Sequence, residues 1–255
     1  MGTIKTKEEI EIIKQGGQKL AAAIEATSKH LKPGISTKEL DAIFEKEVRK
    51  LGGDPAFLGY RPEGVNKPFP ASLCASINDV VVHGIPNENH ILKEGDIITL
   101  DGGLIYKSLY TDHARTFPVG KISAQAKLLI DTTRNALKVA IEAIVPGGHI
   151  GDIGAAIEKY VKPYKFGIVR ELAGHGVGYT VHEDPYVPNY GKVGQGEVLK
   201  PGMVLAIEPM LNLGTRFVSF SRDGYTVTTK DHNLSAHFEH TVVVTETGCE
   251  ILTEV

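Results

Sequence analysis

The chain has 255 residues, of which 42% are hydrophobic and 23% are charged, and its formal net charge is −3. This length can bury a sizeable core, and the slightly acidic charge gives no reason to expect a nucleic-acid or anionic-membrane partner. The first seven residues contain no apolar stretch typical of a secretory signal, and no apolar run is long enough to span a membrane. Cys74 and Cys249 are too few for a disulfide framework, so we expect a cytoplasmic protein.

The first third of the chain predicts two helices followed by a loop. Thr6 is followed three residues later by Glu, and so is Ser36, so each begins a helix through a capping box. Apolar residues then recur on one helical face until a Pro-Gly or a Gly-Gly step ends the run. Residues 54–70 are rich in Gly and Pro and predict a surface loop.

The remaining chain combines strand-like and helical segments. Short β-branched runs predict strands at 80–82, 97–100, 116–119, 204–207, 225–228 and 238–244. Helical periodicity predicts two more helices, at 124–144 and 152–161. Because helices precede strands in each half, the pattern indicates an α+β fold. No linker rich in Pro, Ser or charge is visible, so we expect a single compact domain over residues 1–255.

The two halves of the chain, about 1–120 and 121–255, resemble each other. Residues 92–101 (LKEGDIITLD) match residues 199–208 (LKPGMVLAIE). The VHGIP of 82–86 corresponds to the VHEDP of 181–185, and a Pro-Gly step stands before an acidic-apolar pair in both halves. Three correspondences in the same order predict a duplicated unit. We therefore expect a pseudo-twofold fold whose functional site lies between the halves.

The matched segments each end in an acid, Asp101 in the first half and Glu208 in the second. A desolvated carboxylate at the end of a buried strand needs a partner or a metal ion. Either acid alone would be interpreted as an exposed strand end. Two acids at equivalent positions favour a metal site.

Three further residues extend this set. Asp112 follows Asp101 at hairpin distance, so both carboxylates can face one point. Glu239 precedes a β-branched run, and His175 lies between glycines that would let a metal or substrate approach closely. Each has a common structural interpretation, as a solvated strand residue or a packed loop histidine. Together, four carboxylates and one imidazole favour a hydrolytic site with two metal ions over a structural zinc site.

The order of these motifs resembles the type I methionine aminopeptidases. The motifs are VHGIP at 82–86, the two aspartates, GHGVG at 174–178, IEPM at 207–210 and FEHT at 238–241, and they span nearly the whole chain. The resemblance implies the pita-bread fold, in which two pseudo-twofold-related halves surround a central antiparallel sheet. It also implies a dinuclear centre held by Asp101, Asp112, His175, Glu208 and Glu239. Cobalt, manganese, iron and zinc all suit these ligands, so the identity of the two ions stays open.

The same resemblance implies the reaction, which is removal of the initiator methionine from nascent proteins and peptides, with a small second residue preferred. The substrates would be peptides with an N-terminal Met and nascent chains, the latter at the ribosome. Glu208 would also move a proton from the attacking water to the departing amine. The duplication pairs His83 with His182, and the matching positions in the family contact the substrate. His182 would hydrogen-bond the carbonyl oxygen, and His83 the amine or peptide nitrogen.

Selectivity for methionine needs an apolar pocket. The positions that match the pocket of the family are Phe69, Cys74, Val181 and Tyr225. An ordinary core role is equally open for these side chains. Bacterial relatives often carry Phe and Trp where Val181 and Tyr225 stand, and the segment 60–68 is longer than usual. These departures concern fine specificity and leave the reaction class unchanged.

Two other functions stay open. An Xaa-Pro aminopeptidase or dipeptidase would share the metal ligands but usually carries an additional N-terminal domain, for which the 82 residues before His83 leave little room. A non-catalytic peptide- or RNA-binding relative would have lost metal ligands that are all present here. The chain has neither a Cys- and His-rich N-terminal extension nor a large helical insertion, which fits the short bacterial form. Nothing indicates an obligate interface, so we expect a monomer.

Overall fold

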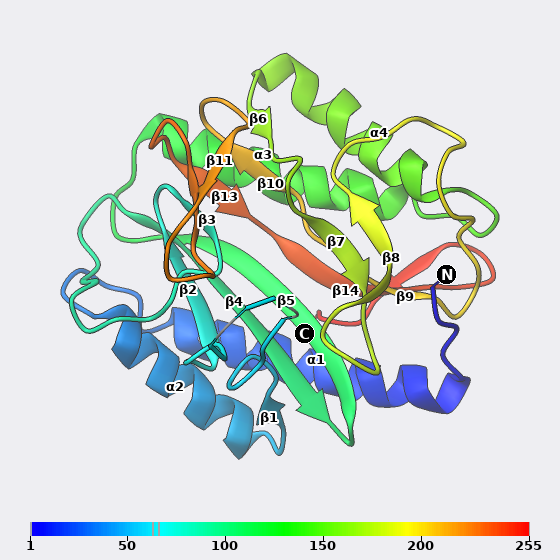
Figure 1. The fold of residues 1–255 in the computed structure, drawn as a ribbon, viewed down its shortest axis with the longest axis horizontal. Coiled ribbons are helices and arrows are strands. Elements are labelled where there is room, and N and C mark those ends of the chain that lie inside the picture. Colours follow the sequence, from blue (N-terminus) through cyan, green and yellow to red (C-terminus); the bar gives the residue numbers. More distant parts are fainter. Residues whose placement is uncertain (1, 63, 66, 255) are drawn as a thin grey trace.

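A large antiparallel sheet forms the centre of the molecule in the computed structural model, which describes residues 2–62, 64–65 and 67–254 (Figure 1). Within these ranges its strands are β1 (Asp54–Pro55), β2 (Leu73–Ile77), β4 (Ile97–Tyr106), β5 (Leu109–Pro118), β7 (Ala173–Gly176), β8 (Glu183–Pro188), β9 (Val204–Ile207), β14 (Glu239–Val244) and β15 (Cys249–Ile251). They follow the order β1-β4-β5-β14-β9-β7-β8, with β2 paired to β4 and β15 paired to β14. Every pair is antiparallel, which confirms the predicted central antiparallel sheet.

The four predicted helices are all present. They are α1 (Lys7–Ser28), α2 (Thr37–Lys50), α3 (Ala124–Glu142) and α4 (Ile150–Val161), the last followed by the 3-10 turn η1 (Lys162–Tyr164). The Thr6 and Ser36 side chains accept hydrogen bonds from the third residue of their helices, and both capping boxes are complete. Helix α4 begins two residues earlier than expected, because the Asp152 carboxylate accepts a 2.7 Å hydrogen bond from the His149 backbone N–H.

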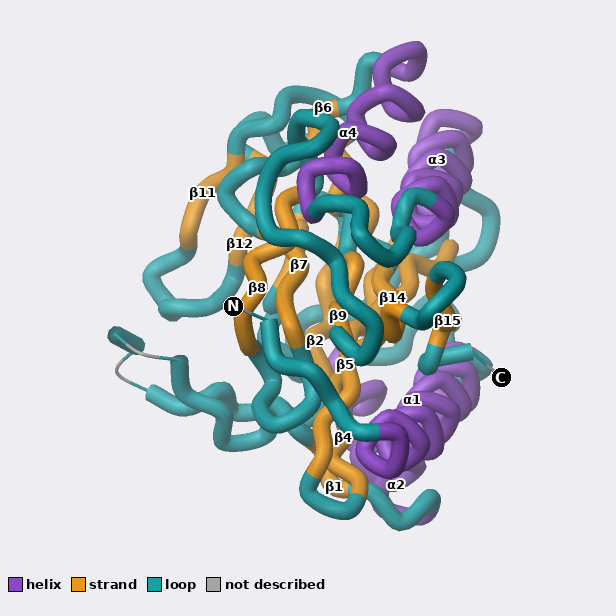
Figure 2. Tube along the Cα trace, turned by 90° about the vertical axis from the view of Figure 1, so that its right-hand side faces the viewer, coloured by secondary structure: helices purple, strands orange, loops and turns teal. Residues whose placement is uncertain are grey.

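The helices all cover one face of the sheet, and the opposite face is left to other segments (Figure 2). Helices α1 and α2 bury an apolar cluster against β4 in which Leu20, Phe44 and Leu104 are fully inaccessible. A side chain at Gly102 would collide with the Phe44 ring, so this glycine faces the helices. Because neighbouring strand residues point to opposite faces, Asp101 must face away from them.

Two small three-stranded sheets lie beside the central one. The first contains β13 (Ser235–His237), β10 (Met210–Asn212) and β6 (Gly167–Ile168), and the second contains β11 (Val218–Phe220), β12 (Val227–Thr229) and β3 (Val80–Val82). Figure 2 shows β11 and β12 on the side of the central sheet away from the helices. No helix within the described ranges is both long and apolar enough to cross a membrane.

Three local expectations need correction. Residues 54–70 do not form a plain surface loop, because they include β1 and bury Ala56, Phe57 and Phe69 in an apolar cluster; Glu63 and Asn66 of this segment lie outside the described residues. The strand expected at 116–119 already begins at Leu109, since its first half pairs fully with β4. Asp101 lies inside β4 rather than at a strand end, because the strand continues to Tyr106.

Candidate active site

Three of the predicted acids project from the face of the sheet that the helices leave free. Asp101 on β4 is the register partner of Ala114 on β5, and Ala114 is in turn the partner of Glu239 on β14. Asp112 lies two residues before Ala114 and therefore on the same face. The short alanine side chain leaves the space between the three carboxylates open.

The other two predicted residues, His175 and Glu208, come from two neighbouring strand segments of the second half of the chain. His175 on β7 is the register partner of Ala206 on β9, and Glu208 follows two residues later. The glycines beside His175 have a structural reason other than metal access. A side chain at Gly174 would collide with the Ala206 carbonyl oxygen, and one at Gly176 would collide with the Asp184 carbonyl oxygen. Glycine is therefore required for the close approach of the neighbouring backbone.

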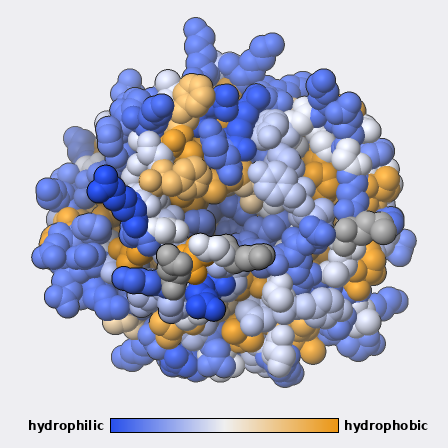
Figure 3. Space-filling view, in the orientation of Figure 1, coloured by the Kyte–Doolittle hydropathy of each residue, from blue (hydrophilic) through white to orange (hydrophobic). Residues whose placement is uncertain are grey.

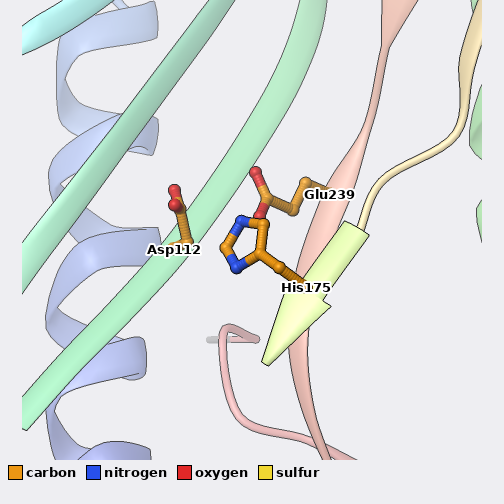
Figure 4. Close-up of side chains that lie close together, drawn as sticks. All are labelled: Asp112, His175 and Glu239. Carbon is orange, nitrogen blue, oxygen red and sulfur yellow. The ribbon is translucent and has the colours of Figure 1, made fainter. Parts of the chain in front are cut away.

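The five side chains line one cavity of about 220 Å³. Within it, ligand atoms of Asp112, His175 and Glu239 all lie within 4.8 Å of one another, and Figure 4 shows the three side chains grouped above the strands. His175 Nε2 is 3.4 Å from Glu208 Oε1. The mouth of the cavity opens on the face shown in Figure 3, where the surface is hollowed near the centre.

Burial and mutual repulsion raise the pKa values of the carboxylates in this cluster. Burial raises the pKa of Asp101 to about 7. Burial and the neighbouring carboxylates raise the pKa values of Asp112, Glu208 and Glu239 well above their usual range. Asp101 Oδ1 and Glu239 Oε1 are buried with no hydrogen-bond partner among the described residues. Burial lowers the pKa of His175 to about 4, so its imidazole is neutral near pH 7. Unpartnered carboxylate oxygens beside a neutral imidazole are the donors that a divalent metal ion requires, so the residues present fit such an ion.

We expect the metal-free protein to lose stability as the pH rises. The pKa of Asp101 is about 7 in the folded chain against an ordinary value of 3.8, so the folded state binds more protons and is favoured at low pH. The stabilisation from protonated Asp101 is complete when the pH is below 3.8, the ordinary pKa of the group. It is lost as the pH rises through about 7, the pKa of Asp101 in the folded chain. Bound divalent ions replace the protons, so the gain in melting temperature on adding manganese should be larger at about pH 7.5 than at about pH 5.

Differential scanning fluorimetry of chelator-treated protein, with and without manganese at both pH values, measures this difference. An equal gain at the two pH values would contradict the proposed repulsion within the carboxylate cluster.

His83 and His182 line the same cavity. His83 follows β3 with a φ of 58°, a left-handed conformation that turns the chain sharply. His182 is exposed at the cavity mouth, and its ring centroid lies 4.4 Å from that of His175. Desolvation by the cavity walls lowers the pKa values of both His83 and His182, which favours neutral imidazoles.

The segment that carries His182 is held to the N-terminal residues by an ion pair and a cation–π contact of Lys5. The Glu183 carboxylate lies 2.6 Å from Lys5 Nζ, whose side chain is fully buried. It also accepts the backbone N–H groups of Tyr179 and Thr180. The ammonium group of Lys5 lies 4.4 Å from the centre of the Tyr179 ring. Residues on both sides of His182 are therefore held in place.

The predicted pocket residues form an apolar wall beside the carboxylates. Phe69, Cys74 and Tyr225 line the cavity. Val181 is buried in the same apolar cluster as Phe69 and Cys74 but is not among the residues that line the cavity. The Tyr225 hydroxyl donates to the Lys67 carbonyl oxygen at 2.5 Å, so Tyr225 and the long segment 60–68, two departures from the bacterial pattern, are in direct contact.

Several residues of the cavity do not stand out in the sequence. Phe57, Tyr60 and Phe220 also line it. His237 Nε2 lies 3.8 Å from Glu208 and 4.0 Å from Glu239, and neither ring nitrogen has a partner among the described residues. Burial lowers the pKa of His237 to about 3.

Thr241 supports the centre from the backbone side. Its hydroxyl donates to the Asp112 carbonyl oxygen at 2.7 Å and accepts the Asp112 backbone N–H at 3.0 Å. These bonds continue the link between β14 and β5 beyond the last paired residues, Glu239 and His240. Alternation along β14 is the signal that could have found Thr241, since it lies two residues after Glu239 on the same strand.

Comparison with known proteins agrees with this geometry. Residues 11–246 match metallopeptidase family M24. Methionine aminopeptidase 1 of Bacillus subtilis (strain 168) is 46% identical over 251 residues, which cover 98% of each chain. The crystal structure of methionine aminopeptidase from Thermotoga maritima superposes with a TM-score of 0.95 at 42% identity and full coverage of both chains.

Prolidase from Pyrococcus furiosus shares the fold, with a TM-score of 0.79 and 26% identity. The alignment covers 99% of this chain but only 65% of the prolidase chain, so the prolidase is the longer protein. The likeness to the methionine aminopeptidases extends over both complete chains and is stronger in sequence and in structure. The chain therefore belongs to metallopeptidase family M24 and, within it, to the methionine aminopeptidases.

Proposed function

We propose that this protein removes the N-terminal methionine from nascent proteins and peptides, with a preference for a small second residue. The observation that carries the proposal is a single cavity with a carboxylate and imidazole cluster on one side and an apolar wall on the other. Such a cavity can hold the scissile amide at the polar side and a thioether side chain at the apolar side. The names of the relatives support the same substrate.

Two divalent metal ions are the proposed cofactors, and manganese, iron, cobalt or zinc would suit the donors. Asp101, Asp112, His175, Glu208 and Glu239 would hold them, since these side chains share the cavity and include buried oxygens without partners. When bound, such ions lower the pKa of a water molecule and polarise the substrate carbonyl.

The side chains of the protein have separate roles in the proposed reaction. Glu208 takes a proton from the attacking water and passes it to the departing amine. His182 donates a hydrogen bond to the carbonyl oxygen as that oxygen gains negative charge. His83 holds the amine or peptide nitrogen. Phe69, Cys74, Val181 and Tyr225 surround the methionine side chain, either in the cavity wall or in the cluster behind it.

The proposal extends to the substrates, location, oligomeric state and domain organisation of the protein. Substrates are N-terminal Met peptides and nascent chains, including those still on the ribosome, and no nucleic acid or membrane takes part. We also propose a cytoplasmic monomer with one catalytic domain over residues 1–255, built from pseudo-repeats of about 1–120 and 121–255. The net charge of −3 supports the absence of a nucleic-acid or membrane partner, and the sequence correspondences support the pseudo-repeats.

The test is an assay of chelator-treated protein on the peptides Met-Ala-Ser and Ala-Pro-Ala, with manganese, cobalt, iron or zinc added in turn. We expect metal-dependent release of methionine and no cleavage before proline. Cleavage of the proline peptide instead would assign the protein to the Xaa-Pro peptidases and leave the metal ligands unchanged. Release of no amino acid from either peptide, despite bound metal, would contradict the proposed substrate.

A further inference from the structure

The His182 ring has one hydrogen-bond partner among the described residues, and that partner is Tyr60. The Tyr60 hydroxyl lies 2.7 Å from His182 Nδ1, and the two ring centroids are 5.4 Å apart. A phenol hydroxyl is a stronger donor than an imidazole N–H, and an imidazole nitrogen is a stronger acceptor than a phenol oxygen. Tyr60 therefore donates and Nδ1 accepts. A neutral imidazole that accepts at Nδ1 carries its hydrogen on Nε2.

This arrangement has the opposite polarity to the histidine of a Ser-His-Asp triad. There a carboxylate accepts from Nδ1, which leaves Nε2 as a base. Here a hydroxyl donates to Nδ1, which leaves Nε2 as a donor that cannot take up a proton. The Nε2 atom has no hydrogen-bond partner among the described residues, and the ring lines the cavity. A donor at this place suits an oxygen that gains negative charge.

The backbone of Tyr60 is itself anchored. Its N–H donates to the Phe57 carbonyl oxygen at 2.9 Å, and its carbonyl oxygen accepts the Phe69 N–H at 2.7 Å. The Tyr225 hydroxyl, which donates to the Lys67 carbonyl oxygen, lies 3.3 Å from the same Tyr60 carbonyl oxygen. Phe57 and Phe69 are buried in the apolar cluster beside the cavity. The Tyr60 hydroxyl is therefore presented to His182 from a fixed position.

We propose that Tyr60 is a positioning residue that holds His182 in the tautomer with hydrogen on Nε2, so that His182 acts as a hydrogen-bond donor to the substrate carbonyl oxygen. This inference deepens the proposed function and rests on it. Tyr60 also gives the long segment 60–68 a role in the reaction, since the segment begins at this residue.

The kinetic test replaces Tyr60 by phenylalanine, which keeps the ring and removes the hydroxyl. We expect kcat for methionine release to fall about fivefold to tenfold, with KM changed by less than about twofold, because the contact matters most when charge develops on the carbonyl oxygen. Tyr164→Phe is the matched control, because it removes a hydroxyl from an exposed tyrosine that is not among the residues lining the cavity and makes no hydrogen bond with His182 among the described residues. A raised KM at unchanged kcat would overturn the proposal, since Tyr60 would then be only a wall of the pocket.

A double-mutant cycle separates an effect through His182 from a general one. If Tyr60 acts through His182, Tyr60→Phe should cause no further loss of kcat in a His182→Ala background. The same fivefold to tenfold loss in that background would overturn the proposal.

A readout independent of turnover is the tautomer itself. Zinc-loaded protein labelled with 15N-histidine should show His182 with a non-protonated Nδ1 and a protonated Nε2, assigned by the signals missing in His182→Ala. Tyr60→Phe should give a mixture of tautomers, and Tyr164→Phe should not. A protonated Nδ1 in the wild-type protein would overturn the proposal. A Tyr60-dependent tautomer in a protein that releases no methionine would support the contact and overturn the proposed function alone.

Discussion

Replacing Asp112 or Glu239 by alanine should lower kcat/KM for methionine release at least about a thousandfold at a fixed metal concentration. These two carboxylates and His175 are the group whose ligand atoms lie within 4.8 Å of one another. Removal of either leaves too few donors to hold an ion at that point. The measurement combines the turnover of a Met-Ala-Ser peptide with the metal content of the dialysed protein, and both should fall.

Stability distinguishes loss of metal from loss of folding. Burial and neighbouring charges raise the pKa values of Asp112 and Glu239, so each destabilises the metal-free protein near neutral pH. The metal-free alanine variants should therefore melt no lower than metal-free wild type. Glu246→Ala removes an exposed carboxylate outside the cavity and should keep both metal content and turnover. Near-normal turnover of Asp112→Ala or Glu239→Ala would show that the ligand assignment is wrong.

Replacing His182 by alanine should lower kcat about a hundredfold to a thousandfold, with a much smaller change in KM. The proposed hydrogen bond to the carbonyl oxygen is strongest when that oxygen carries charge, so its loss raises the barrier more than it weakens substrate binding. Metal content should stay at the wild-type level, because His182 is a proposed substrate contact and not a ligand. His175→Ala should behave differently and lose metal.

An exposed histidine supplies the control for this series. His232 pairs with Asp79 at 2.8 Å and is not among the residues that line the cavity, so His232→Ala should retain normal kinetics. A His182→Ala protein that lost its metal would identify His182 as a ligand instead. An unchanged kcat with a raised KM would limit its role to substrate binding.

The local signals in the sequence were sufficient for the helices, and the repeat predicted two of the acids of the candidate site. A capping box depends on residues three apart, as at Thr6 and Ser36, so it can be recognised before any tertiary contact is known. The matched acids Asp101 and Glu208 were identified from the repeat, and both line the cavity. Motif order also indicated the fold and the family correctly.

Other features depended on contacts between residues far apart in the chain. Tyr60 meets His182 across 122 positions, and Thr241 meets Asp112 across 129. No periodicity in one segment encodes such a contact, because it depends on the strand register and on how loops pack over the sheet.

The same reason explains the expectations that needed correction. Phe57 and Phe69 belong to a segment rich in Gly and Pro, and only packing against the cavity wall buries them. The glycines around His175 reflect the close approach of β8 and β9, which no property of the segment itself reveals. The sequence by itself determined the helices, the family and the reaction class and predicted the acids of the candidate site, because these follow from local patterns and motif order. Only the tertiary structure decided which polar groups are left without partners and which side chain orients His182, because burial and register are properties of the assembled sheet.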